Sequence, residues 1–140
     1  MSAASLARRI LAVAAGFLAV AVLSTVTDQV LHAAGVYPPG GRTMSDELFA
    51  LALAYRVVFT VLGGWITARL APERPMTHAM VLAGIGLVAA IAGASYALAH
   101  PELGPAWYPW SLVVTAVPCV WLGARVAIAR HANPARPAGA

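Results

Sequence analysis

Four long stretches of apolar residues divide this chain, and each is separated from the next by a short polar or proline-rich segment. The stretches cover residues 10–34, 48–71, 76–99 and 106–129. A helix needs about 20 mostly apolar residues to cross a membrane, because it rises about 1.5 Å per residue through a hydrocarbon core about 30 Å thick. The pattern therefore predicts an all-α membrane protein with four transmembrane helices in one domain, residues 1–140.

The connections between these stretches are short, covering residues 35–47, 72–75 and 100–105. Short connections make consecutive helices antiparallel neighbours. We therefore predict an up-down-up-down bundle. In lipid such helices associate where small side chains let their backbones approach, and small residues recur four positions apart in the last three stretches. The candidates for these contacts are Gly64, Ala68, Gly86, Ala90, Ala94, Gly123 and Ala127.

Composition agrees with a lipid environment, since 61% of the residues are hydrophobic and only 10% are charged. An ordinary soluble domain carries about 25% charged residues. The lipid bilayer is therefore the expected surroundings of the helices. The first stretch is too long for the apolar core of a signal peptide, so we expect it to be retained as a helix.

The arginines predict the orientation of the bundle. Basic residues concentrate on the cytoplasmic side of membrane proteins. Arg42 alone lies on one side of the predicted bundle. Seven arginines lie at the opposite helix ends: Arg8, Arg9, Arg69, Arg74, Arg125, Arg130 and Arg136. This bias predicts that both termini lie in the cytoplasm. Arginines at helix ends suit lipid headgroups rather than the basic stripe of a nucleic-acid-binding protein, so no nucleic-acid partner is expected.

Two ionisable residues, Asp28 and Arg56, lie inside apolar stretches. A charge at membrane depth costs about 2.5–3.5 kcal/mol, so such residues pair with one another or serve a function. Counted from the outer helix ends, they lie roughly 9 and 12 Å deep. Adjacent antiparallel helices would bring them to nearly the same level, so we predict a bidentate ion pair between them.

Further polar residues accompany the pair on the same two helices. Ser24, Thr25 and His32 lie near Asp28, and Tyr55 and Thr60 lie near Arg56. Two interpretations remain open. In the first, the pair is structural and fixes the register of the two helices. In the second, these residues line an outward-facing cavity that binds a cation, a proton or another ligand.

A metal site is the weaker alternative. Asp28 and His32 share a helical face, and His100 and Glu102 lie at the same outer boundary, so a carboxylate and imidazole cluster is conceivable. No spacing typical of a metal or cofactor motif accompanies them, and we expect neither a metal nor another cofactor. The sequence also lacks G-x-S-x-G, H-E-x-x-H and a phosphate-binding glycine loop, so we expect no enzyme activity.

Two recognisable segments lie at the second apolar stretch, Ala54-Tyr55-Arg56 and residues 63–72, GGWITARLAP. These segments resemble small four-helix bacterial inner-membrane proteins of no known activity, in which a helix ends in Gly-Gly and then Ala-Arg-Leu-Ala before a short cytoplasmic turn. The resemblance implies a multi-pass protein of the bacterial inner membrane. Small multidrug resistance transporters are a poorer match, because Asp28 lies near the outer end of its helix and the arginines favour one orientation.

These observations lead to two hypotheses about function. The first is a non-enzymatic accessory or structural membrane protein, whose partner would be a second copy of the chain or another membrane protein. The second is a small transporter or a ligand- or cation-binding protein that uses Asp28 and Arg56. Helices three and four carry polar residues only in their outer halves, which favours a structural role or an outward-facing pocket over a path through the membrane.

Overall fold

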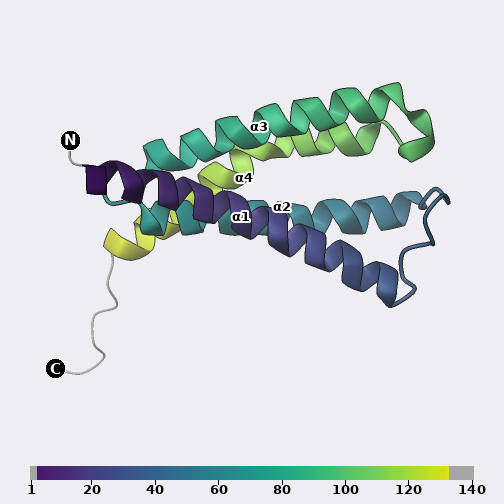
Figure 1. The fold of residues 1–140 in the computed structure, drawn as a ribbon, viewed down its shortest axis with the longest axis horizontal. Helices are drawn as coiled ribbons and strands as arrows, with labels where there is room; N and C mark the ends of the chain where they lie inside the picture. Colours follow the sequence, from purple (N-terminus) through teal and green to yellow (C-terminus); the bar gives the residue numbers. More distant parts are fainter. Residues whose placement is uncertain (1–2, 133–140) are drawn as a thin grey trace.

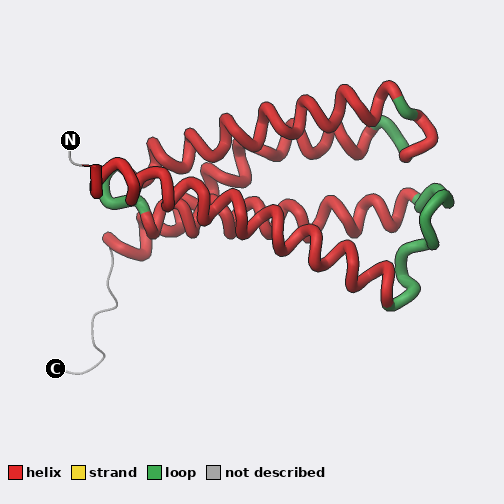
Figure 2. Tube along the Cα trace, viewed as in Figure 1, coloured by secondary structure: helices red, strands yellow, loops and turns green. Residues whose placement is uncertain are grey.

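The computed structural model describes residues 3–132, which fold into four long helices (Figures 1 and 2). These are α1 (Ala3–Ala33), α2 (Asp46–Leu70), α3 (Pro75–Ala99) and α4 (Trp107–Ala132), with a short 3-10 helix, η1 (Pro101–Leu103), between the last two. This part of the chain contains no strand, and all four long helices are long and apolar enough to cross a membrane. The predicted helical class and the number of helices are confirmed.

The helices extend past the predicted apolar stretches, most of all at the two ends of the described chain. Helix α1 begins at Ala3 rather than residue 10, and α4 ends at Ala132 rather than residue 129. The predicted limits followed the apolar residues, but arginine and alanine are good helix formers, so the helices continue past the apolar stretches. Arg136, one of the seven arginines used to predict orientation, lies outside the described residues.

Large apolar side chains face outward in this fold, and small ones fill its interior. Val114 is 71% exposed and Val88 69% exposed, whereas Ala79, Ala124 and Ala127 are buried. Soluble proteins rarely expose such continuous apolar surface. The distribution fits helices surrounded by lipid, where close approach of backbones, and not burial of large side chains, holds the bundle together.

Helix α2 is central and contacts α1, α3 and α4, with α4 as its most extensive neighbour. Helix α2 approaches α1 and α4 most closely at glycines. A Cβ added to Gly63 would lie 3.0 Å from the carbonyl oxygen of Gly16 in α1, and one added to Gly123 in α4 would overlap the carbonyl oxygen of Val61. Only glycine permits helices to approach this closely, so these positions fix where α2 crosses its neighbours.

The predicted small-residue contacts are partly found. Gly64 and Gly123 lie at the α2–α4 crossing, and Ala68, Ala94 and Ala127 are buried. Gly86 differs, because a Cβ added there would meet nothing within 4 Å. Gly86 does not lie at a contact between helices; together with Ala90 it lines a cavity.

The two ends of the molecule are packed differently. We call the end that carries residues 34–45 and 100–106 the loop end, and the end that carries the 71–74 turn the turn end (Figure 2). Toward the turn end the helices form a core that includes Ala68, Ala79, Leu82 and Ala124. In Figure 1 α1 and α3 diverge toward the loop end. Helices α2 and α4 stay in contact there, because Phe49 packs against Trp107 and Tyr108 and the indole N–H of Trp107 donates to Asp46. The site described next lies where α1 and α3 diverge.

Candidate functional site

The structure brings together Asp28 and Arg56, the two charged residues predicted to lie at membrane depth. The Nη2 atom of Arg56, on α2, donates to Oδ2 of Asp28, on α1, at 2.5 Å. The two side chains are 30% and 28% exposed, so the pair is half-buried and lines a hollow instead of filling a core. The pair joins α1 to α2 on the loop-end side of the Gly16–Gly63 crossing.

Tyr55 completes the coordination of the carboxylate. Its hydroxyl donates to Oδ1 of Asp28, so Arg56 binds one carboxylate oxygen and Tyr55 binds the other. The predicted bidentate pair is therefore not found, because Arg56 donates to a single oxygen. The Tyr37 hydroxyl lies 3.2 Å from that of Tyr55 and donates to it, since Tyr55 has already given its proton to Asp28. We call Asp28, Arg56, Tyr55 and Tyr37 the Asp28 network.

Tyr37 reaches this network because the chain folds back after α1. Gly35, with φ of 73°, ends the helix. The Gly35 N–H donates to the carbonyl oxygen of His32, and the Val36 N–H donates to the carbonyl oxygen of Leu31. This pair of bonds is the Schellman motif, which favours glycine at the left-handed position. The reversal buries Tyr37, which is only 4% exposed.

Other predicted site residues take separate positions around the network. Ser24 is buried and Thr25 exposed, and both line the cavity described below. The Thr60 hydroxyl donates to the backbone carbonyl of Arg56 at 2.7 Å. His32 is exposed and its ring packs edge-on against Tyr37, with 5.3 Å between the ring centres.

The four candidate metal ligands are not brought together. Nδ1 of His100 lies 3.0 Å from Oε1 of Glu102, beyond the end of α3, while Asp28 is engaged by Tyr55 and Arg56. Within residues 3–132 no three His, Cys, Asp or Glu side chains are grouped closely enough to hold a metal ion. The structure therefore gives no support to a metal cluster of these residues.

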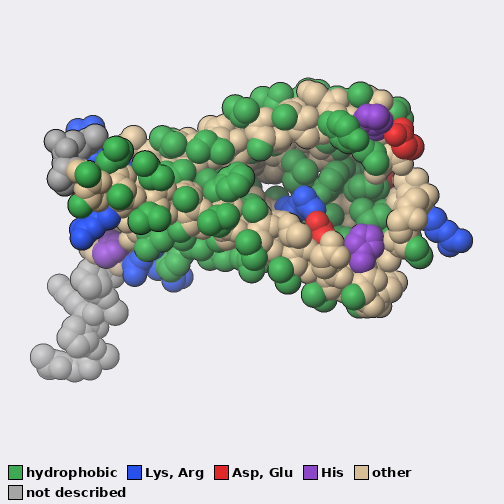
Figure 3. Space-filling view, in the orientation of Figure 1, with side chains coloured by type: hydrophobic (Ala, Val, Ile, Leu, Met, Phe, Trp, Pro, Cys, Tyr) green, Lys and Arg blue, Asp and Glu red, His purple; other side chains and the backbone are tan. Residues whose placement is uncertain are grey.

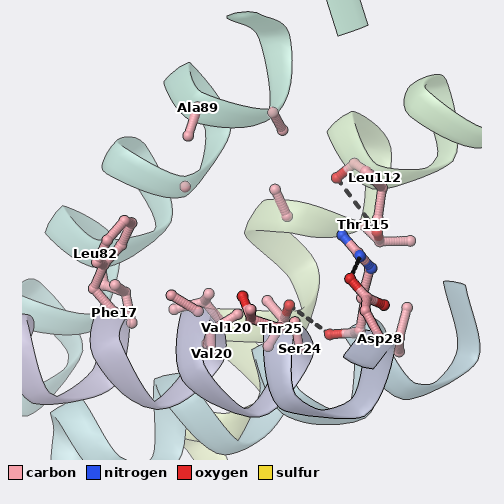
Figure 4. A pocket seen from close by; sticks show the side chains of 17 residues that line it. Phe17, Val20, Ser24, Thr25, Asp28, Leu82, Ala89, Leu112, Thr115 and Val120 are labelled. Carbon is pink, nitrogen blue, oxygen red and sulfur yellow. Dashed lines mark hydrogen bonds and ion pairs between the residues drawn. The ribbon is translucent and has the colours of Figure 1, made fainter. Parts of the chain in front are cut away.

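A central cavity of about 400 Å³ extends from the Asp28 network between the two hairpins. All four long helices contribute to its wall. Figure 4 shows Asp28 at one end of the cavity and Phe17 and Leu82 at the other. The cavity therefore has a polar end at the ion pair and an apolar end near the core. Its size falls within the roughly 300–1,000 Å³ of small-molecule sites.

A second cavity, of about 350 Å³, lies on the loop-end side of the ion pair. Asp28 and Arg56 line both cavities, and the second is completed by residues that include His32, Tyr37 and Tyr108. The ion pair thus forms the partition between a central cavity and a loop-end cavity.

The central cavity opens sideways between α1 and α3. Ala21 and Thr25 on α1 and Ala89 on α3 line it and are nevertheless exposed, which places them at its rim. Figure 3 shows a hollow between the two hairpins in which basic and acidic side chains are visible. We call this opening the α1–α3 slot. Small residues leave space in its rim, and the one large residue within residues 3–132 that both lines the cavity and is exposed is Phe17.

Sequence reasoning missed Tyr37, Tyr108 and the wall supplied by α3 and α4. The Tyr37 hydroxyl lies 3.2 Å from that of Tyr55, and Tyr108 lines the loop-end cavity. Gly35 was the available signal for Tyr37, since a glycine after a helix end indicates a chain reversal. No comparable signal marks Leu112 or Thr115, which line the cavity only because of how α4 packs.

Comparison of the chain with protein families, with curated proteins and with solved structures finds no match. The class defined by fold and site is an all-helical protein with four potential membrane spans and a cavity beside an Asp–Arg pair. Its function has to be argued from the geometry of its own residues.

Proposed function

We propose that this chain is a non-enzymatic, multi-pass protein of the bacterial inner membrane that binds a small ligand from the bilayer in its central cavity. The observation that carries the proposal is the cavity of about 400 Å³ with a polar end at Asp28 and Arg56 and a side opening between α1 and α3. A structural ion pair needs no such cavity, and a packed interface would satisfy it better.

The same pair has an architectural role in this proposal. By joining α1 to α2 and satisfying both carboxylate oxygens, it holds the polar end of the cavity in place. The accessory role suggested by the sequence and the ligand site are therefore compatible. The pair orders the bundle, and the ligand occupies the space that the ordered bundle leaves.

In our proposed orientation the helices cross the membrane alternately, with the turn end and both termini in the cytoplasm and the loop end outside. The arginine distribution supports it. Two inner arginines also lie over tryptophan rings one helical turn away, Arg69 over Trp65 at 5.4 Å and Arg125 over Trp121 at 5.2 Å. Tryptophan and arginine together are typical anchors at the headgroup level.

Binding is better supported than transport through the protein. The central cavity ends at Leu82 and Val120, which belong to the core of the turn end. Thr67 is fully buried there, close against Gly16 at the α1–α2 crossing. A transport path has to reach both faces in at least one state. The described residues provide instead a pocket with a side entrance and a closed inner end.

A variant that fills the cavity tests this function. A Cβ at Gly86 meets open space, and Gly86 lines the cavity, so Gly86→Phe should occupy it without displacing a helix. Gly84→Phe on the same helix is the matched control, because Gly84 is equally unobstructed but does not line the cavity. We expect a total lipid extract, with its neutral lipids retained, to raise the unfolding temperature of the wild type and of Gly84→Phe, but much less that of Gly86→Phe.

The proposal requires that the increase in unfolding temperature caused by lipid depend on glycine at position 86. An equal rise in all three proteins would show that the lipids act on the outer surface alone. No rise in the wild type would remove the evidence for a membrane ligand.

A further inference from the structure

The central cavity is electrically balanced. Of the described residues that line it, only Asp28 and Arg56 carry a formal charge, and they oppose each other in an ion pair. An anionic or cationic ligand would therefore leave an uncompensated charge at membrane depth, where one charge costs about 2.5–3.5 kcal/mol. A ligand without net charge avoids this cost.

The polar end of the cavity can still donate hydrogen bonds. A guanidinium has five N–H donors, and Asp28 takes the one that Nη2 directs at Oδ2. The Nε atom of Arg56 is buried and has no hydrogen-bond partner within residues 3–132. By contrast, the hydroxyls of Thr60 and Thr115 each donate at 2.7 Å to a backbone carbonyl of their own helix, that of Arg56 and that of Ser111 respectively. Because Nε itself is shielded, the remaining Nη groups of Arg56 are the ones that can meet an acceptor oxygen, and the Ser24 and Thr25 hydroxyls line the same cavity.

The rest of the cavity suits a hydrocarbon tail that arrives from the side. Its far end is formed by Phe17 and Leu82 (Figure 4), and Val120 adds to its apolar wall. The rim of the α1–α3 slot includes the small residues Ala21, Thr25 and Ala89, which leave room for a tail to pass beside Phe17. With the four helices spanning the bilayer as proposed, this slot opens sideways toward lipid, so a ligand dissolved in the bilayer reaches the cavity without crossing water.

We infer that the ligand is an uncharged, single-tailed amphiphile with a carbonyl or ester oxygen, which enters through the α1–α3 slot and places that oxygen against Arg56. This inference rests on the proposed function and names the ligand class of the same cavity. A monoacylglycerol and a prenyl quinone share this chemistry, and they differ in whether the oxygen belongs to a glycerol ester or to a ring.

Three probes with the same acyl tail and a carbonyl beside it isolate the effect of charge. They are a monoacylglycerol, which is uncharged, an N-acyltaurine, which is anionic, and an acylcholine, which is cationic. Titrated into the full-length protein in non-ionic detergent, the monoacylglycerol should bind with one-to-one stoichiometry and roughly tenfold or more tightly than either ion. Gly86→Phe should lose this binding and Gly84→Phe should keep it. A short-tailed quinone serves as a fourth probe that distinguishes the two sources.

Asp28→Asn provides an independent check of the sign of the charge effect. It leaves Arg56 unbalanced, so the preference should shift toward the N-acyltaurine, whereas the acylcholine should bind worse than to the wild type. Should this variant fail to fold, the three-probe series on the wild type still decides the matter.

Outcomes of the titration separate this inference from the proposed function. Equal or tighter binding of either ion to the wild type would overturn the inference, and so would a lack of binding by both uncharged probes. If the lipid extract still stabilises the protein in a Gly86-dependent way, the cavity remains a ligand site and only the ligand class is wrong. If that stabilisation is also absent, the proposed function itself fails.

Discussion

At the scale of single residues, the Asp28 network shows how a membrane helix accommodates a carboxylate. Both oxygens of Asp28 accept a hydrogen bond, one from Tyr55 and one from Arg56, and Tyr37 supports Tyr55 in turn. Charge-assisted bonds of this kind are about twice as strong as neutral ones. Where water is scarce, the removal of one partner leaves the other unsatisfied, so the members should depend on each other.

A double-mutant cycle measures this dependence. We expect Asp28→Asn and Arg56→Gln each to lower the free energy of unfolding in detergent by about 1–3 kcal/mol, a range that allows for the partial exposure of both side chains. The double variant should lose less than the sum, with a coupling of about 1 kcal/mol or more. Strictly additive losses would show that the two side chains do not interact in the folded protein.

The sequence indicated Asp28 and Arg56 because charge in an apolar stretch is rare and because their depths match. It indicated Tyr55 by its place beside Arg56. It did not reveal which carboxylate oxygen each donor would take, since that depends on the rotation of α1 against α2. Nor did it reveal Tyr37, whose position depends on the left-handed Gly35 and not on any periodic pattern.

At the scale of the helices, glycine position decides which faces meet. Gly123 lies so close to Val61 on α2 that a Cβ would overlap the Val61 carbonyl oxygen. Gly93, on α3, is exposed and has nothing within 4 Å of a Cβ. The same substitution should therefore have opposite effects at these two sites.

We expect Gly123→Ala to lower stability by about 1–3 kcal/mol, because the backbones of α2 and α4 must separate to admit the methyl group. Gly93→Ala should be neutral or slightly stabilising, since alanine has the higher helix propensity. Unfolding of both variants in mixed micelles, monitored by circular dichroism, compares their stabilities directly. Equal losses at the two positions would mean that α2 and α4 do not cross at Gly123.

Element positions were largely predictable, whereas the neighbours of each element were not. Four apolar stretches predict four helices, because length and hydropathy alone decide whether a helix can cross a membrane. Small residues at four-residue spacing identified Gly64 and Gly123 at a contact but also suggested Gly86, which lines the cavity. In an alanine-rich chain the spacing does not distinguish a helix contact from an open space.

At the scale of the whole molecule, the proposed orientation places the loop end outside and the turn end in the cytoplasm. Single cysteines test it in a background in which the natural Cys119 is replaced by alanine. In intact cells Thr43→Cys, in the 34–45 loop, should react with a membrane-impermeant maleimide, whereas His131→Cys, at the end of α4, should react only after the membrane is opened. The reverse pattern would contradict the orientation.

The overall shape follows from unequal packing along the bundle. Small side chains close the turn end, where Ala79 and Ala124 are completely buried. Toward the loop end α1 and α3 diverge (Figure 1), while α2 stays in contact with α4 through Phe49. The Asp28 network joins α1 to α2 at this level. The cavity and its slot result from this difference. They could not be predicted from the sequence, because they depend on how α1 and α3 diverge and not on any one of the helices.

Native mass spectrometry of the protein released from its own membrane tests the central claim most directly. We expect the wild type and Gly84→Phe to carry one bound small molecule per chain, and Gly86→Phe to be released without it. A wild type that carries no bound molecule, or a Gly86→Phe variant that carries as much as the wild type, would contradict a ligand site in the central cavity.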